Sequence, residues 1–365
     1  MKLKFKLIFK AFKEAPVDYW GFFLRMYISN RWPQIMKLYH NMLDRRWNKV
    51  KPADNLSRLK HCYVTSIPNT RAGIGHTLSE YITGRIWAHK TGVSYAHCQL
   101  VEPWESILYF QGDAPTLREL KKRGIKTYKM PRHPSDPKKL DYKEIKAKWA
   151  SLAKEEAVCF ILGDGQNAYD IAYPSQELRQ LYRSHPDFEK RLDVREKNKI
   201  NISVHIRRRN QADMLNPSVH DVNSSAYRAR YLESDYFLSL CQIIEEVLGA
   251  DEVQFNLFSQ GDLEAFSEFK VLKNLRFCLE TDQYETFHNL TLSDILIVSP
   301  SSFSFKAGML CPGLKFAKYP WWHEVPDNEE WIRVGEDPLS EKARLSQHLH
   351  AFVKLHVTKS TFLSG

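Results

Sequence analysis

A chain of 365 residues with 43% hydrophobic and 26% charged residues is too apolar for a disordered protein and long enough for two domains. Its formal net charge of +10 favours an anionic partner, which can be a nucleic acid, a membrane surface or a phosphorylated ligand. No run of 18 apolar residues occurs, so the composition excludes a predicted transmembrane helix.

The first 13 residues carry lysines inside an apolar segment, which is not the pattern of a signal peptide. As a helix, this segment would place aromatic and aliphatic residues on one face and lysines on another. Two interpretations stay open, which are packing on the protein surface and peripheral contact with an anionic membrane. The six cysteines lack C-x-x-C spacing and predict reduced thiols, so a cytoplasmic location is expected, with or without that membrane contact.

Short apolar runs alternate with helical stretches from about residue 60 onward. Strand-like runs occur at residues 61–67, 92–100, 125–130 and 157–165. The segments between them, such as residues 77–90 and 115–124, have helical periodicity. This alternation predicts a parallel sheet covered by helices on both faces.

A charged stretch, residues 183–199, interrupts the alternation and has the composition of an interdomain helix or linker. A helix over 234–249, for which Ser234 is the expected N-cap, belongs to a second alternating series, and a last polar helix is expected at about 340–359. The strand-like runs of this series are residues 200–206, 253–259, 275–280, 293–299 and 314–320. The sequence therefore predicts two doubly wound α/β domains, residues 1–190 and 191–365.

Ligands of open parallel sheets bind outside the carboxyl ends of the strands, so the loops that follow strands are the informative ones. The first such loop is contained in "NTRAGIGHTLSEYITG", where Gly73 and Gly75 permit close approach of a ligand to the backbone. His76 follows and can act as a base or a hydrogen-bond donor. The alternative interpretation is an ordinary tight turn between a strand and a helix.

The second loop is contained in "VHIRRRN", where an apolar strand ends in three arginines. His205 and Arg207 are expected on one side of the strand end, with Arg208 on the other. A guanidinium group matches a pair of phosphate oxygens, which favours a phosphate-containing ligand. The alternative is a surface cluster that binds nucleic acid, but such clusters usually lie on exposed helices or tails, so no nucleic-acid partner is expected.

Two further loops carry polar residues after or before strands. Ser259 ends a strand ahead of a helix that Asp262 is expected to cap. Asp294 precedes the run "ILIVS", which leads to serines at a helix start, namely Ser301, Ser302 and Ser304. Hydroxyl groups and free backbone N–H groups at a helix N-terminus form an anion site, although ordinary capping would also explain them.

Together these motifs resemble those of the GDP-fucose-dependent fucosyltransferases, the superfamily of α-1,2-, α-1,6- and protein O-fucosyltransferases. "RAGIGHTLSEYITG" looks like the family signature G-x-G-N-x-x-x-x-Y-x-x-G, "VHIRRRN" looks like H-x-R-R-G-D or H-x-R-R-T-D, and "LSDILIVSPSSFSFKAGML" is similar to the S-S-F-S region. The resemblance spans roughly residues 60 to 320, with the motifs in the family's order. It implies a GT-B fold, with two facing Rossmann-like domains and a sugar nucleotide held mainly by the second.

The resemblance also implies roles for single residues. Arg207 would bind the donor's diphosphate, Arg208 would support it, and His205 would shape the nucleotide pocket. Ser302 and Ser304 would belong to the serine loop that contacts the nucleotide. The remaining positions implied to contact the sugar nucleotide are Gly73, Gly75, Ser259, Asp262 and Asp294.

Three departures from the family pattern bear on the donor and the mechanism. Arg209 and Asn210 replace the Gly-Asp or Thr-Asp pair, and His76 stands where asparagine is found in the α-1,2- and some protein O-fucosyltransferases. "SQGD", residues 259–262, replaces an S-D-D-type stretch that contacts the guanosine side. The resemblance is therefore more specific for glycosyl transfer than for fucose.

The function expected from these observations is inverting transfer of a sugar, L-fucose from GDP-fucose first, to a hydroxyl of a glycan or glycolipid. Arg207 would stabilise the departing diphosphate, and His76 or Asp213 would assist deprotonation of the acceptor, a choice that spacing leaves open. No D-x-D triplet occurs, so neither a metal nor another cofactor is expected. The alternatives are another nucleotide sugar on the same scaffold and a nonenzymatic protein that binds nucleic acid or anionic glycans.

Overall fold

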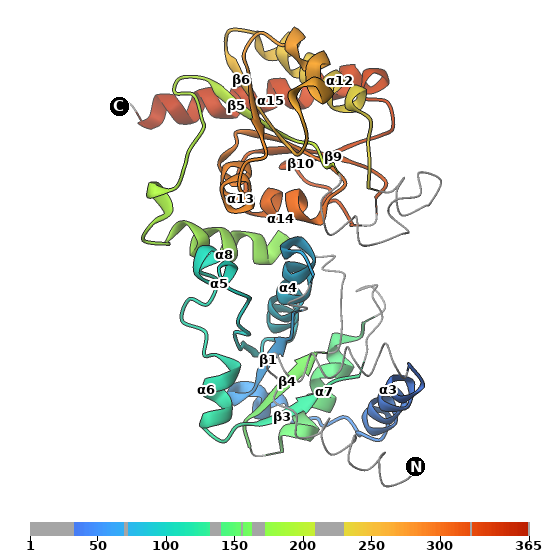
Figure 1. Ribbon diagram of the computed structural model, residues 1–365. Coiled ribbons are helices and arrows are strands. Elements are labelled where there is room, and N and C mark those ends of the chain that lie inside the picture. Colours follow the sequence, from blue (N-terminus) through green and yellow to red (C-terminus); the bar gives the residue numbers. More distant parts are fainter. Residues whose placement is uncertain are drawn as a thin grey trace. The chain divides into compact units, whose positions relative to one another are not determined.

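The chain divides into two compact units, Met1–Pro174 and Ser175–Gly365 (Figure 1). Within the parts that the structure describes, no helix combines the length and the apolar character needed to cross a membrane. This computed structural model describes residues 33–68, 72–131, 140–154, 156–162, 172–208, 230–321 and 323–363.

The first unit contains a four-stranded parallel sheet in the order β2-β1-β4-β3. Its central pair is in register from Tyr63, opposite Cys159, to Ser66, opposite Leu162. The strands are β1 Tyr63–Ser66, β2 Ser94–Tyr95, β3 Lys126–Lys129 and β4 Val158–Leu162. The helices are α3 Pro33–Asn48, η1 Leu56–His61, α4 Ile74–Thr91, α5 Trp104–Leu108, α6 Leu117–Lys122 and α7 Tyr142–Ala153.

Stacked aromatic rings hold helices α4 and α7 of the first unit on the sheet. Trp149 of α7 lies parallel to Phe160 of β4, with ring centroids 4.3 Å apart, and also stacks on Trp87 of α4. Helix α4 approaches β1 closely because Gly84 has no side chain: a Cβ atom there would lie 2.9 Å from the backbone nitrogen of Ser66. The glycine of the Y-x-x-G element is therefore a packing residue.

The second unit contains a six-stranded parallel sheet in the order β10-β9-β8-β5-β6-β7. The first strand of this unit, β5, lies between β8 and β6, so the chain winds outward from β5 in both directions, as in a Rossmann fold. The strands are β5 Ile200–His205, β6 Val253–Ser259, β7 Leu275–Leu279, β8 Ile295–Val298, β9 Leu314–Lys318 and β10 Trp331–Val334.

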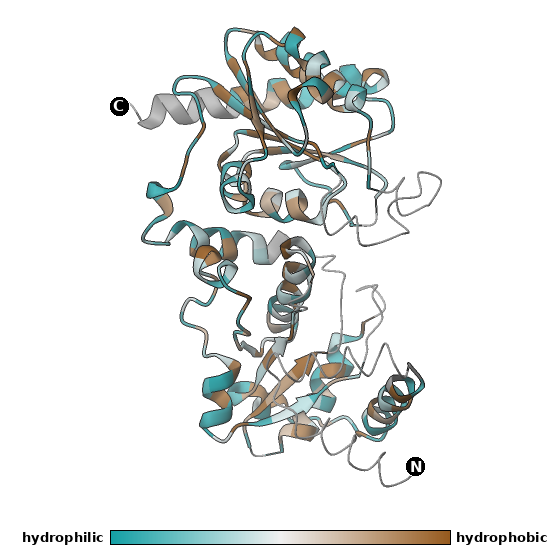
Figure 2. Ribbon diagram, viewed as in Figure 1, coloured by the Kyte–Doolittle hydropathy of each residue, from teal (hydrophilic) through white to brown (hydrophobic). Residues whose placement is uncertain are grey.

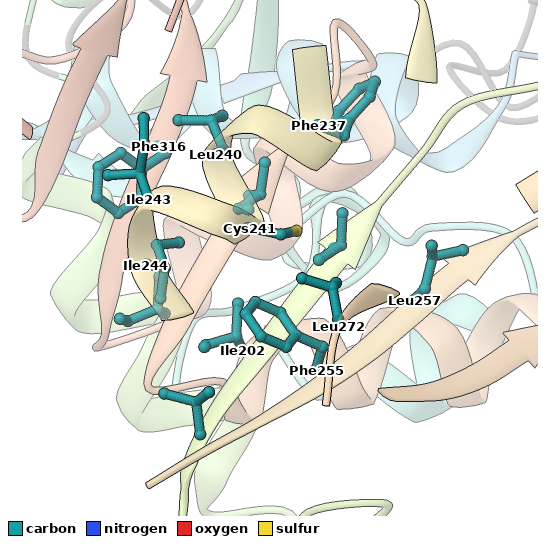
Figure 3. Close-up of a cluster of buried hydrophobic side chains, with 14 of the residues drawn as sticks. Ile202, Phe237, Leu240, Cys241, Ile243, Ile244, Phe255, Leu257, Leu272 and Phe316 are labelled. Carbon is teal, nitrogen blue, oxygen red and sulfur yellow. The ribbon is translucent and has the colours of Figure 1, made fainter. Parts of the chain in front are cut away.

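Alternation of apolar and polar residues along β5 assigns its two faces. Ile202 and Val204 belong to a hydrophobic core that also includes Leu345 of α15. Figure 3 shows Ile202 in this core with Phe237 of α12. Ser203 lies on the other face, where its hydroxyl is 2.6 Å from that of Ser293, next to α13. The helices of this unit are α8 Ala172–Arg183, η3 Phe188–Lys190, α12 Ser234–Leu248, η4 Leu263–Val271, α13 Gln283–Leu292, α14 Ser302–Leu310, η5 Leu339–Glu341 and α15 Lys342–Leu363.

Polar contacts of Arg179 and Tyr182 attach helix α8 to the second unit. The Arg179 guanidinium donates hydrogen bonds to the carbonyl oxygens of Met309 and Cys311 at the end of α14. The Tyr182 hydroxyl lies 2.9 Å from Nδ1 of His288 on α13. Burial, the largest effect, lowers the pKa of His288 to about 4, so this ring is neutral at pH 7.

The predicted α/β class is confirmed: the chain contains two units, each with a parallel sheet and helices. Figure 2 shows hydrophobic strands in the second sheet and hydrophilic residues on α6. Strand β10 was not predicted, and the N-cap of α12 is Glu233 instead of Ser234, which is already helical. All six cysteines are free thiols.

Candidate functional site

The carboxyl ends of β5 and β8 bring together side chains from two distant segments of the sequence. The two strands are adjacent and parallel, with Val204 opposite Ile297, so the residues that follow them share one edge of the sheet. Nδ1 of His205 lies 3.0 Å from the Ser299 hydroxyl, and Nη1 of Arg207 lies 3.4 Å from the Ser301 hydroxyl. This edge is also the switch point of the sheet, where Rossmann-type folds bind ligands.

His205 is a neutral positioning group in this arrangement. Burial, with a smaller contribution from the charge of Arg207, lowers the pKa of His205 to about 3. A neutral imidazole can exchange one hydrogen bond with Ser299 without adding a second positive charge beside Arg207. The ring also packs near Phe303, with centroids 5.6 Å apart, and so connects the end of β5 to α14.

Arg208 turns away from Arg207, as the alternation along the strand predicts. Its guanidinium donates to the carbonyl oxygen of Leu232 and to the hydroxyl of Ser234 at the start of α12, and it lies over the ring of Phe266. These contacts tie the loop after β5 to the helix side of the sheet. Arg208 therefore supports the loop that carries Arg207.

The N-terminus of α14 completes the cationic side of the site. This helix begins at Ser302, after the extended residue Ser301, and its first backbone N–H groups form the positive end of the helix dipole. The Ser302 hydroxyl lies 2.8 Å from Nε2 of His323, whose ring stacks on Phe305 at 4.9 Å. An arginine, serine hydroxyls and a helix N-terminus together form a site suited to an anionic group such as phosphate.

His323 is a site residue that sequence reasoning missed. It follows β9, so the rule that ligand-binding loops come after strands would have pointed to it. The pairing of its ring with Ser302, 21 positions earlier, arises only in the folded chain.

Two predicted ligand-binding serines have internal partners in this structure. The Ser304 side chain is completely buried and its hydroxyl bonds to the carbonyl oxygens of Ser299 and Ser301. The Ser259 hydroxyl donates to the carbonyl oxygen of Ile206 at 2.8 Å. Both side chains hold the loops of the site in shape.

Two predicted acidic site residues differ from expectation. Asp294 lies at the amino end of β8, where Oδ2 accepts from the backbone N–H of Asn201 at 2.8 Å. Because Asn201 is the second residue of β5 and His205 is the last, Asp294 is separated from the site by roughly 13 Å of strand. Asp262 occupies the N-cap position of η4, but its side chain makes no capping hydrogen bond, so the expected cap is wrong in that respect.

The residues predicted from the first glycine motif lie at the start of α4, in the first unit. Gly73 is the N-cap with an ordinary φ of −59°, and Gly75 is buried in the first turn. Nε2 of His76 lies 3.9 Å from Oε1 of the buried Glu80, one turn further along the helix. The Glu80 carboxylate lies where it can orient the His76 ring.

Several sequence predictions lie outside the described residues, namely Asp213, Arg209 and the amphipathic segment of residues 1–13. Within the described ranges, no group of three or more His, Cys, Asp or Glu side chains is arranged to hold a metal ion. The fold and the site define a chain with a Rossmann-type unit whose switch point is suited to an anionic ligand.

Comparisons with known proteins give similarities at the level of structure. No protein-family model matches the chain, and no curated protein matches it. The chain is similar to POFUT1 in complex with GDP (11% identity, TM-score 0.44, 75% of this chain and 98% of that one) and to POFUT1 in complex with GDP-fucose (10% identity, TM-score 0.40, 75% and 97%). It is also similar to a UDP-forming α,α-trehalose-phosphate synthase from Burkholderia xenovorans (11% identity, TM-score 0.28, 57% and 52%).

Proposed function

We propose that the protein is a glycosyltransferase of the GT-B type that takes its sugar from a nucleoside diphosphate sugar. The observation that carries this proposal is the meeting of Arg207, Ser301 and the N-terminus of α14 at the switch point of the second sheet. A diphosphate bound there would contact the Arg207 guanidinium and the first backbone N–H groups of α14.

The arrangement suits the charge changes of an inverting transfer. As the acceptor oxygen forms its bond to the anomeric carbon, the bond from that carbon to the diphosphate breaks and the electron pair stays on the diphosphate. Arg207 and α14 would stabilise this added negative charge. The proton of the acceptor hydroxyl would pass to a base, for which His76 with Glu80 behind it and Asp213 remain the two candidates.

GDP-fucose is the donor we propose first, and a glycan or glycolipid hydroxyl is the proposed acceptor. The support for fucose is the set of motifs around His76, Arg207 and Ser302. Another nucleotide sugar is the alternative donor. Ser259, in the loop expected near the nucleobase of the donor, bonds to the protein backbone, and Asp262 makes no capping bond.

The proposal is tested by incubating the protein with GDP-, UDP- and dTDP-sugars and measuring the released nucleotide with and without a panel of glycan acceptors. Release that is fastest with GDP-fucose and is accelerated by an acceptor supports fucosyl transfer. Faster release from another donor would change the proposed donor and leave the proposed glycosyltransferase activity unchanged. Binding of polyanions without turnover of any donor would contradict the enzyme and favour a nonenzymatic binding protein.

A further inference from the structure

Helix α14 contains a buried lysine that forms no ion pair with any described residue. The Lys306 side chain has no solvent exposure, and within the described part of the chain its Nζ has no hydrogen-bond partner. Nζ lies 5.2 Å from the centroid of the Phe305 ring, which is a weak substitute for an acceptor. Burial lowers the pKa of Lys306 to about 7.

The other buried lysines of the described chain each have a carboxylate partner. Nζ of Lys315 lies 2.7 Å from Glu330, that of Lys318 lies 2.6 Å from Glu336, and that of Lys148 lies 2.8 Å from Glu144. A buried ammonium group without such a partner is unfavourable for the folded state. The contrast shows that no described residue supplies an acceptor for Lys306, so a bound ligand is a candidate for that role.

The position of Lys306 on α14 identifies where that group would bind. Lys306 lies one helical turn after Ser302, so both side chains project from the same face, and helical side chains lean toward the N-terminus. The contacts agree with this direction, because Phe305, next to Nζ, stacks on His323, which is bonded to Ser302. The direction of helical side chains therefore aims the ammonium group toward the N-terminal end of α14, which follows the contact between Arg207 and Ser301.

We propose that Lys306 is a second cationic ligand for the phosphate groups bound at the N-terminus of α14. A phosphate oxygen would be the acceptor that its ammonium group lacks, and the bound diphosphate would then be held by a guanidinium and an ammonium group. This inference rests on the proposed function, since it assigns the phosphate groups to the nucleoside diphosphate of the donor.

The test is calorimetric titration of the full chain with GDP, inorganic pyrophosphate and guanosine, for the wild type and for Lys306→Met. Met has a similar length but no charge, so we expect the Kd for GDP and for pyrophosphate to rise by roughly tenfold or more. The Kd for guanosine should stay within about twofold, since guanosine has no phosphate group for the ammonium to meet. The matched control is Lys342→Met, which removes one exposed positive charge from the same unit and should leave all three values unchanged.

Thermal unfolding of the unliganded variant separates a ligand-binding role from a structural one. If Lys306 has no partner in the free protein, Lys306→Met should keep or raise the Tm, because it removes a buried charge. Should the Met variant fold poorly, Lys306→Gln retains a hydrogen-bond donor without the charge and should show the same loss of pyrophosphate affinity.

Three outcomes decide the matter. Equal pyrophosphate affinity in wild type and Lys306→Met overturns the role of Lys306, and if the wild type still transfers a sugar, the proposed function stands. A wild type that binds no pyrophosphate also overturns it. Lysine-dependent pyrophosphate binding by a protein that turns over no nucleotide sugar supports the phosphate site and contradicts the proposed function.

Discussion

Arg207 and Arg208 are consecutive residues whose guanidinium groups contact different helices. Arg207 donates to Ser301, directly before α14, whereas Arg208 donates to Ser234 at the start of α12. The period of two along a strand sends neighbouring side chains to opposite faces of a sheet. Arg207 thus contacts the serine loop of the site, while Arg208 anchors the loop after β5 to α12.

We expect substitution of Arg207 to reduce turnover more strongly than substitution of any other residue of this loop. Arg207→Lys keeps the charge but loses the paired donors, and it should lower kcat/KM by about tenfold. Arg207→Ala should lower it by on the order of 10²-fold, comparable with loss of an oxyanion donor. Initial rates with saturating acceptor, together with the Kd for GDP, check both values. Equal and small losses for both variants would indicate a diffuse basic surface.

Arg208→Met is expected to affect stability first. The substitution removes hydrogen bonds from a half-buried guanidinium to Leu232 and Ser234, which predicts a loss of about 2 kcal/mol in the free energy of unfolding. Urea unfolding monitored by circular dichroism measures this loss. Turnover of the folded variant should exceed that of Arg207→Ala, and the opposite order would mean that Arg208 contacts the donor.

His76→Ala is expected to lower turnover by roughly 10²-fold or more while changing the Kd for GDP by less than about threefold, if His76 is the base. Glu80→Gln should give a smaller loss in kcat, because it removes only the carboxylate 3.9 Å from the ring. Asp213→Asn is the comparison variant. A large loss for Asp213→Asn beside near-normal turnover of His76→Ala would transfer the role of base to Asp213.

Turnover should not require a divalent metal. The chain has no D-x-D triplet, and Arg207 with the N-terminus of α14 is proposed to neutralise the diphosphate. Rates measured after dialysis against EDTA should equal those measured with added Mg²⁺ or Mn²⁺. Loss of activity in EDTA and its recovery with Mn²⁺ would show the expectation to be wrong.

The stability of the second unit should fall as the pH falls from about 6.5 to about 4, in part because of His288. Its pKa is lowered to about 4 in the folded chain, whereas an unfolded histidine takes up a proton near pH 6.5. The unfolded state therefore binds more protons in this window, and stability decreases with falling pH. His288→Gln removes this difference, so its urea midpoint should change less than that of the wild type between pH 7 and 5. If the urea midpoints of the two proteins changed with pH in parallel, His288 would be excluded as a source of the pH dependence.

The parts of the fold that were predicted from sequence are those that depend on local sequence patterns. Alternation of strands and helices gave both parallel sheets, and the apolar run that ends at His205 located the edge of the second sheet. Asp294 was assigned to the site by resemblance, although a residue that precedes a strand lies at the opposite edge from the loops that follow strands. The position of Asp294 before its strand therefore predicted the opposite edge of the sheet correctly.

The remaining parts depend on contacts between segments that are distant in sequence. The pairing of β9 with β8 brings His323, which follows β9, to Ser302, which follows β8. Lys306 interrupts an apolar helix, and the pattern alone would make it a solvent-exposed residue. Its burial, without a partner among the described residues, follows from packing around α14, which the local sequence pattern does not predict.

The attachment of α8 has a mechanical consequence. This helix starts at the division between the two compact units, and its Arg179 holds the carbonyl oxygens at the far end of α14 together with Glu330 of the neighbouring strand segment. The chain therefore enters the second unit through an element fastened to the helix whose other end forms the anion site. Helix α14, nine residues long, therefore links the place where the chain enters the second unit to the anion site at Ser302.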